Sequence, residues 1–91
     1  MSMYNPSHPG RIIRQRLIED QDGQKIDSVA IVAERLGCHR NTLNRVLNGS
    51  ASVTPEMAFA LEQAGAGQAE FWLHMQANYD LFQLRQRRGA A

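Results

Sequence analysis

Hydrophobic and polar positions follow a helical period in five stretches of the chain, and the two clearest stretches meet within residues 28–49. Ser28 is a good N-cap, because its hydroxyl can accept a hydrogen bond from a free backbone N–H of the first turn. Gly37 stands where a helix end needs a residue that tolerates a positive φ. Between them, apolar residues recur at the i, i+3, i+4, i+7 spacing of one buried helix face: Val29, Val32, Ala33 and Leu36.

A second helical pattern resumes within three residues of that glycine and stops at Asn48-Gly49. Its apolar positions include Leu43 and Val46, which predict a buried face. Two helices of about two turns, joined by a short turn with a glycine, describe a helix-turn-helix, the motif whose second helix enters the major groove of DNA. The polar side chains of that second helix are expected to face outward: Arg40, Asn41, Asn44 and Arg45.

These four side chains suit the recognition of base edges. Arg can bond to guanine O6 and N7, and Asn to adenine N6 and N7, each through two hydrogen bonds. No acid lies between Arg35 and Thr54, and Glu and Lys, the usual choices for a face that only contacts solvent, are absent there. We expect base readout from the four side chains and phosphate contacts from Thr42, His39 and Ser50. The alternative is an ordinary helical hairpin with a solvated polar face.

Three further helices are predicted around this motif. The first covers residues 9–20, opens on a proline, and follows a flexible arm at residues 1–8 that lacks periodicity. The fourth starts at residues 54–56, where a threonine N-cap, a proline and an acid follow one another. The fifth spans about residues 68–84, and residues 85–91 form a basic tail that is expected to be flexible.

The fifth stretch carries apolar side chains on more than one face, whereas a helix on the surface of a small monomer needs only one apolar stripe. One part of the set is therefore expected to pack on the core and another part on a second copy of the chain. Aromatic residues are enriched at the centres of such interfaces. A protein that binds the two half-sites of a DNA palindrome is also favoured to be a two-fold symmetric dimer. The alternative is that they all fill the core of a monomer. The expected interface residues are Trp72, Met75, Tyr79 and Phe82.

Length and composition restrict the class of protein. The 91 residues, 43% of them hydrophobic, suit one domain over residues 1–91 with a modest core. The single cysteine excludes a disulfide framework and fits a reducing cytoplasm. No apolar run approaches the roughly 18 residues of a membrane span, and no signal peptide opens the chain. The sequence thus predicts a cytoplasmic protein, associated with the nucleoid when it binds DNA.

Charge is uneven along the chain, although the net charge is only +1. Residues 1–50 contain seven Lys and Arg against five Asp and Glu, and residues 51–84 contain four acids and no Lys or Arg. This asymmetry suits a molecule that offers one face to phosphate and another to a basic protein. It also leaves open a protein-binding module that sequesters a basic partner without binding specific DNA.

No arrangement of residues indicates an enzyme, a metal site or a cofactor. Cys38-His39 could supply two zinc ligands, but zinc needs about four, and the other histidines, His8 and His74, lie on distant segments. Cys38 stands at the turn, where a small apolar side chain packs, so a core thiol is expected. The acids are scattered, and no glycine-rich phosphate loop is present.

Four segments together resemble the HigA family of antitoxins, which belongs to the larger Xre/Cro-type helix-turn-helix group. They are His8-Pro9-Gly10, residues 33–37, residues 45–49 and above all Glu-Phe-Trp-Leu-His-Met-Gln-Ala-Asn-Tyr-Asp-Leu at residues 70–81. The resemblance runs from about residue 8 to residue 82. The chain departs from the family at Val29, where a glutamine that contacts phosphate is usual, and at Ser50-Ala51, where a basic residue is common. The loop at residues 20–27 is also about four residues longer than in the family.

The resemblance implies an all-α, five-helix lambda-repressor-like domain with a central helix-turn-helix and a long C-terminal dimerisation helix. It implies a homodimer that binds a palindromic operator in double-stranded DNA and represses its own operon. It also implies a partner, a HigB-type toxin similar to the RelE mRNA endonucleases, which the antitoxin neutralises by direct binding. Base readers of the group match Arg40, Asn41, Asn44 and Arg45, and Thr42 matches a position that contacts the DNA backbone. A stand-alone Xre-type repressor without a toxin is the alternative.

Overall fold

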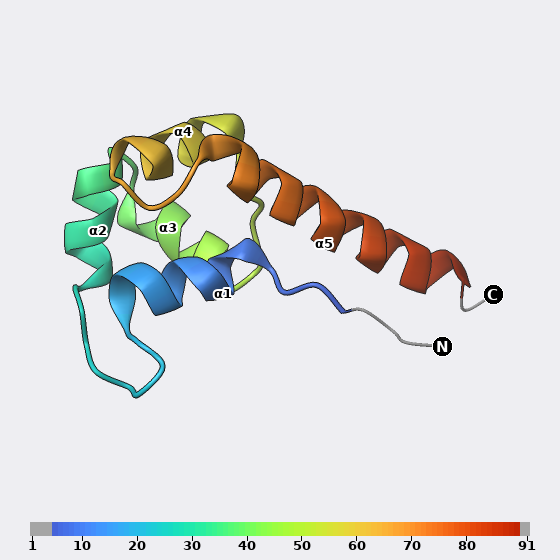
Figure 1. Cartoon of the computed structure of the whole chain (residues 1–91), viewed down its shortest axis with the longest axis horizontal. Coiled ribbons are helices and arrows are strands. Elements are labelled where there is room, and N and C mark those ends of the chain that lie inside the picture. Colours follow the sequence, from blue (N-terminus) through green and yellow to red (C-terminus); the bar gives the residue numbers. More distant parts are fainter. Residues whose placement is uncertain (1–4, 90–91) are drawn as a thin grey trace.

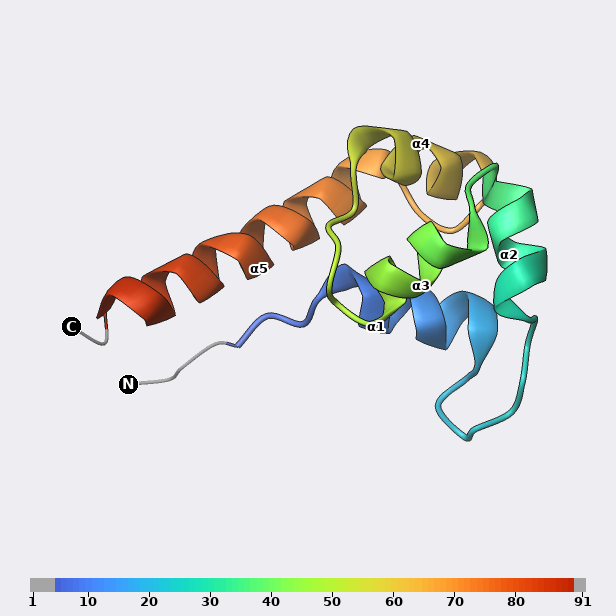
Figure 2. The same cartoon turned by 180° about the vertical axis from the view of Figure 1, so that it is seen from behind.

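The computed structural model describes residues 5–89, and within that range the chain is all-helical apart from one isolated β-bridge. The chain's two ends, residues 1–4 and 90–91, lie outside the described part. Five α-helices surround one core (Figures 1 and 2), as the sequence predicts. The elements are α1 (Pro9–Ile13), continued by the π-helical segment η1 (Arg14–Ile18), α2 (Val29–Leu36), α3 (Arg40–Leu47), α4 (Pro55–Gln63) and α5 (Ala69–Gly89).

The central helices begin and end at the residues that the sequence marks. The Ser28 hydroxyl accepts a hydrogen bond from the backbone N–H of Ile31 at 3.2 Å, and the Thr54 hydroxyl does the same for Met57 at 3.2 Å. Gly37 ends α2 with a φ of 70°, a conformation that L side chains rarely adopt. Because these caps are local, the boundaries of short helices can be predicted from the sequence.

The core forms around α3, between α1, α2 and α4 (Figure 2). Side chains from four helices meet there, and each is at most 1% exposed: Ile13, Leu43, Val46, Leu61 and Trp72. Removing such large apolar side chains from water supplies roughly 1.5–3 kcal/mol each. This burial fixes the orientation of α3, because two of the five side chains belong to that helix.

The first helical stretch ends earlier than predicted. It extends to Ile18 rather than to residue 20, because Glu19 adopts an extended conformation and forms the isolated β-bridge with Lys25. The side chain of Asp20 closes the turn between them, since its Oδ1 accepts hydrogen bonds at 2.9 Å from the backbone N–H groups of Asp22 and Gln24. The long loop before α2 is therefore a small hairpin-like turn.

Helix α5 differs from the prediction in two respects. Trp72 is fully buried in the protein's own core, so it is not available to a second copy, contrary to its assignment to a dimer interface. The helix also continues to Gly89, whereas a flexible tail was expected from residue 85; residues 90–91 of that tail lie outside the described part. Only the first turns of α5 pack against α4, and the remainder extends away from the body (Figure 1).

The N-terminal arm is partly described. Residues 5–8 contain no helix, as expected, but they lie beside α5 rather than free in solvent. Pro6 is buried, and the ring of His8 meets the ring of Tyr79 edge-on, with 4.9 Å between the centroids. These contacts contradict a flexible arm at residues 5–8, and residues 1–4 lie outside the described part.

Candidate nucleic-acid interface

The exposed side of α3 carries the predicted base readers. Arg40, Asn41 and Arg45 are exposed, and Asn44 is half-buried. Their i, i+1, i+4, i+5 spacing places them on one face of the helix, opposite the buried side chain of Leu43. Figure 2 shows α3 on the near side of the molecule, and the exposure of Arg40, Asn41 and Arg45 leaves this face open to a ligand. In a helix-turn-helix, this exposed side of the second helix is the one that enters the major groove.

The three predicted phosphate contacts surround the ends of α3. His39 is the N-cap of the helix, where its Nδ1 accepts a hydrogen bond from the backbone N–H of Asn41 at 3.1 Å. Its other ring nitrogen remains for a ligand. Ser50 donates its hydroxyl to the carbonyl of Arg45 at 3.2 Å, which closes the C-terminal end of the helix. Both residues and Thr42 are exposed.

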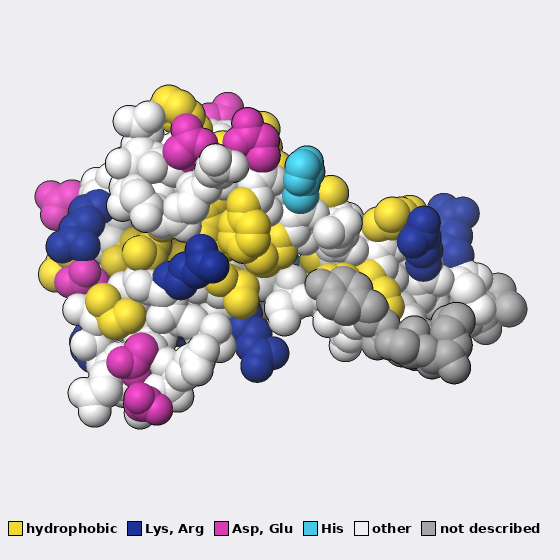
Figure 3. Space-filling model, viewed as in Figure 1, with side chains coloured by type: hydrophobic (Ala, Val, Ile, Leu, Met, Phe, Trp, Pro, Cys, Tyr) yellow, Lys and Arg dark blue, Asp and Glu magenta, His cyan; other side chains and the backbone are white. Residues whose placement is uncertain are grey.

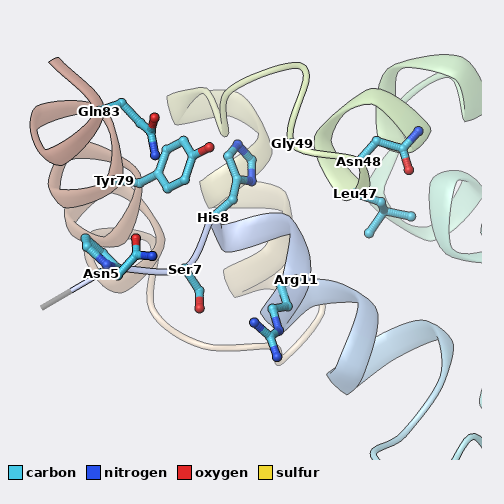
Figure 4. Close-up of a pocket in the computed structure, with 10 residues that line it drawn as sticks. Asn5, Ser7, His8, Arg11, Leu47, Asn48, Gly49, Tyr79 and Gln83 are labelled. Atoms are coloured by element: carbon cyan, nitrogen blue, oxygen red, sulfur yellow. The ribbon is translucent and has the colours of Figure 1, made fainter. Parts of the chain in front are cut away.

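A polar hollow that the sequence analysis did not identify lies beside the C-terminal end of α3. It has a volume of about 430 Å³, and Figure 4 shows that its lining comes from three parts of the chain. Ser7 from the N-terminal arm and Arg11 from α1 make up the first part, Asn48 follows α3, and Tyr79 belongs to α5. Guanidinium, amide and hydroxyl groups are the donors that bind phosphate oxygens. The sequence signal for this hollow is Arg11, at an outward-facing position of the first helix.

A second arginine of the first helix supports the loop after α3. The Nη2 of Arg14 donates a hydrogen bond to the Oδ1 of Asn48 at 3.4 Å. Asn48 therefore links the first helix to the end of the recognition helix. Because Arg14 is half-buried and Arg11 is exposed, Arg14 supports the loop and Arg11 remains free to contact a ligand.

His8 forms the floor of the hollow as a neutral side chain. Its Nδ1 accepts a hydrogen bond from the backbone N–H of Gly10 at 2.9 Å, which caps α1. Burial lowers the pKa of the His8 imidazole below its ordinary value, and a backbone hydrogen bond with Ala51 and the charge of Asp80 partly oppose this shift. The unprotonated form is the one that the cap requires, since a protonated Nδ1 cannot accept a hydrogen bond.

Cys38 packs against the core, as the sequence predicts. Its side chain is half-buried, and burial raises the pKa of its thiol. Within residues 5–89, no group of three His, Cys, Asp or Glu side chains could hold a metal ion. No described helix has the combination of length and apolar character that would let it cross a membrane.

Comparisons with known sequences agree with this geometry. A protein-family profile described as helix-turn-helix matches residues 30–65. Virulence-associated protein A' of Dichelobacter nodosus is 37% identical over 83 residues, which are 90% of this chain and 68% of that protein. Antitoxin HigA-1 of Vibrio cholerae is 34% identical over 82 residues, 90% of this chain and 73% of that protein. The chain thus spans about two-thirds to three-quarters of the length of these relatives.

Solved structures with the same fold include antitoxin GraA. One structure of GraA has a TM-score of 0.83 and 31% sequence identity, and the match covers 96% of this chain and 89% of the GraA chain. Antitoxin GraA in complex with its operator has a TM-score of 0.81 and 30% identity, and covers 99% and 87% of the two chains. With its exposed recognition helix and these relatives, the chain belongs to the HigA family of helix-turn-helix antitoxins.

Proposed function

We propose that this chain is the antitoxin and sequence-specific autorepressor of a toxin–antitoxin operon in the cytoplasm. The observation that carries the proposal is the polar face of α3, with two Arg and two Asn side chains over a buried apolar face. Arg40, Asn41, Asn44 and Arg45 would read base edges in the major groove. The solved complex of the related antitoxin GraA with its operator supports this use of the fold.

Phosphate contacts would hold the recognition helix in place. Thr42, His39 and Ser50 stand around the two ends of α3, and Arg11 adds a positive charge at the hollow beside its C-terminal end. Contacts of this kind fix the register of a protein on DNA but carry no sequence information themselves. Val29 has no polar group to add to them, so the basic side chains would supply much of the binding to the DNA backbone.

A homodimer would present two copies of α3 to a palindromic operator. Met75, Tyr79 and Phe82 are half-buried on α5, and its projecting part also exposes Leu81 (44%) and Leu84 (41%). Large apolar side chains on a helix that leaves the body favour a second copy as their partner. Such a dimer would place its recognition helices in successive major grooves, about 34 Å apart.

The proposed partner is a HigB-like toxin, similar to RelE mRNA endonucleases, which the chain would neutralise by direct binding. The support is membership of the HigA family and the excess of acids in residues 51–84. A short basic protein encoded beside this chain, whose growth arrest is relieved by co-expression of the chain, is the expected result. Absence of such a protein would favour a stand-alone repressor.

Footprinting and gel shifts on DNA upstream of the chain's own gene test the repressor proposal. We expect a protected palindrome, and we expect Arg40→Ala and Asn41→Ala each to weaken binding to it by about 1–3 kcal/mol, with little effect on random DNA. Equal losses on both kinds of DNA would mean that these side chains only hold phosphate. No specific shift at low salt would favour a protein-binding module instead.

A further inference from the structure

An exposed aromatic ring lies beside Arg16, on the side of the first helix away from Asn48 and the end of α3. Phe71, in the first turn of α5, is 39% exposed and meets Trp72 edge-on, with ring centroids 4.9 Å apart. The guanidinium carbon of Arg16 lies 5.3 Å from the centroid of the Phe71 ring and 5.5 Å from that of Trp72. Figure 3 shows hydrophobic side chains at the centre of this side, and the reverse view in Figure 2 brings α3 to the front.

Arg16 is held in place by the rings and by the backbone. Its Nη1 donates a hydrogen bond to the carbonyl of Ala66 at 3.4 Å, and both rings attract its charge. The side chain is nevertheless exposed. An exposed aromatic ring beside a fixed arginine presents the two residue types that contribute most to protein–protein interfaces. Because Arg16 is already ordered, a partner that contacts it loses less side-chain freedom on binding.

Carboxylates surround this pair on two sides. Glu62, near the end of α4, accepts at its Oε1 a hydrogen bond from the backbone N–H of Ala69 at 2.8 Å, and Glu70 is exposed in the first turn of α5. On the other side, a hollow of about 450 Å³ is lined by Arg16 together with Asp20 and Asp22. Figure 3 shows acidic side chains in both places, over α4 and over the loop after η1. We call Phe71, Arg16, Glu62, Glu70 and Asp22 the Phe71 face.

We propose that the Phe71 face docks a basic partner protein, the toxin of the operon, on the side of the first helix away from the end of α3. This inference rests on the antitoxin function proposed above. The excess of carboxylates selects a basic surface and repels DNA. A second copy of the chain fits less well, because a two-fold contact would bring each carboxylate against the same carboxylates of the other copy.

The position of the face has a consequence for regulation. A protein bound over Phe71 would leave Arg40 and Arg45 on α3 uncovered, so the chain could hold its partner and the operator at once. The toxin would then stay bound while the operon is repressed. A partner seated on α3 itself would instead compete with DNA.

Affinity measurements with the full chain test this placement. The probe is the basic protein encoded beside the chain, purified as a catalytically inactive variant. We expect Phe71→Asp to weaken its binding at least about 30-fold, as for the centre of an interface. Glu70→Lys is expected to slow association about tenfold at low salt and less at high salt. Glu34→Lys, an equal charge change at an exposed position of α2 outside the face, is the matched control and should leave binding unchanged.

The outcomes separate this inference from the proposed function. Unchanged binding by both Phe71→Asp and Glu70→Lys would overturn the docking site and leave the antitoxin proposal intact. If the wild-type chain does not bind the neighbouring protein at all, both proposals fall. If Phe71→Asp converts a dimer to a monomer, the face is an interface between copies and the inference is wrong. Glu70→Lys keeps the test valid should Phe71→Asp fail to fold, and operator binding by each variant checks its fold.

Discussion

Gly10 lies where α1 and α3 come closest to each other. A Cβ atom at this position would stand 1.9 Å from the carbonyl oxygen of Val46 and 3.0 Å from the Cα of Leu47. Both contacts are with backbone atoms, so no side chain can move aside to relieve them. The residue therefore determines how deeply α1 packs on the recognition helix, and it explains at atomic scale why glycine follows proline at the start of the first helix.

Gly10→Ala should destabilise the protein strongly. We expect the free energy of unfolding to fall by on the order of 3 kcal/mol, because the two helices must separate to admit one methyl group. Chemical denaturation monitored by circular dichroism measures this change. Gly89→Ala is the control, since Gly89 is also helical and a Cβ there meets nothing within 4 Å. Equal stability of the two variants would show that α1 can shift on α3 without penalty.

His8 should make stability depend on pH. Its folded-state pKa lies below the ordinary 6.5, so the unfolded chain binds a proton first as the pH falls. The contribution of neutral His8 to stability is therefore complete above pH 6.5 and is lost as the pH falls from there through the folded-state pKa. His8→Asn keeps an oxygen acceptor for the N–H of Gly10 but has no proton to gain.

Denaturation midpoints between about pH 8 and pH 5 compare the two proteins. The wild-type chain should lose stability over the acidic part of this range more steeply than His8→Asn. Parallel curves would mean that protonation of His8 is not linked to folding. A curve for His8→Asn that lies lower at every pH would indicate instead that the edge-on contact of the imidazole with Tyr79 is the larger contribution.

At the scale of elements, the central motif could be predicted closely and α5 could not. Ser28, Gly37 and Thr54 act through hydrogen bonds and dihedral angles within a few residues, so their effect is visible in the local sequence. In α5, Trp72 and Tyr79 fall in one helical stripe by spacing alone. Which end of that stripe is covered depends on α4, which reaches only the first turns of the helix.

The C-terminal end of α5 shows a second limit. The charge of the run from Arg85 to Arg88 and its place near the end of the chain predict a flexible tail. Arg and Gln are good helix formers, however, and basic side chains suit the negative end of a helix. No stop signal appears before Gly89, and the helix continues to that residue.

Part of the candidate site could be predicted from the sequence. The sequence predicts the base-reading side chains on α3 but not the hollow beside them, since the lining of that hollow joins residues more than 70 positions apart, from Ser7 to Tyr79.

Phe82→Asp tests whether α5 joins two copies. Phe82 is half-buried on the projecting part of the helix, so a carboxylate there should disrupt a dimer without opening the core around Trp72. We expect a monomer in light scattering at micromolar concentration. Gln86→Asp introduces the same charge one turn further on, at an exposed polar position, and should remain a dimer. A monomeric wild-type chain would contradict the proposed assembly outright.

At the scale of the whole molecule, the fold separates two kinds of surface. The α3 side carries arginines and no acid on the recognition helix, whereas α4 and the first turn of α5 carry acids and no Lys or Arg. The projecting part of α5 lies beyond both surfaces (Figure 1). Pairing through that part would therefore leave the basic side of each copy free for DNA and the acidic side free for another protein.

The spacing of the two half-sites tests this arrangement. A dimer joined by α5, a helix of 21 residues and about 32 Å, would hold its two recognition helices at a fixed separation near 34 Å. Inserting about five base pairs between the half-sites turns one of them to the opposite face of the duplex. Inserting about ten base pairs restores the face but adds roughly 34 Å of distance.

We expect both insertions to reduce the affinity for the operator at least about 100-fold, toward the value for a single half-site. The reason is that binding of the second copy to the same duplex raises the affinity by about this factor through its effective concentration. If affinity is restored with the ten-pair insertion, the link between the two copies is flexible. If affinity is unchanged with the five-pair insertion, each copy binds DNA alone.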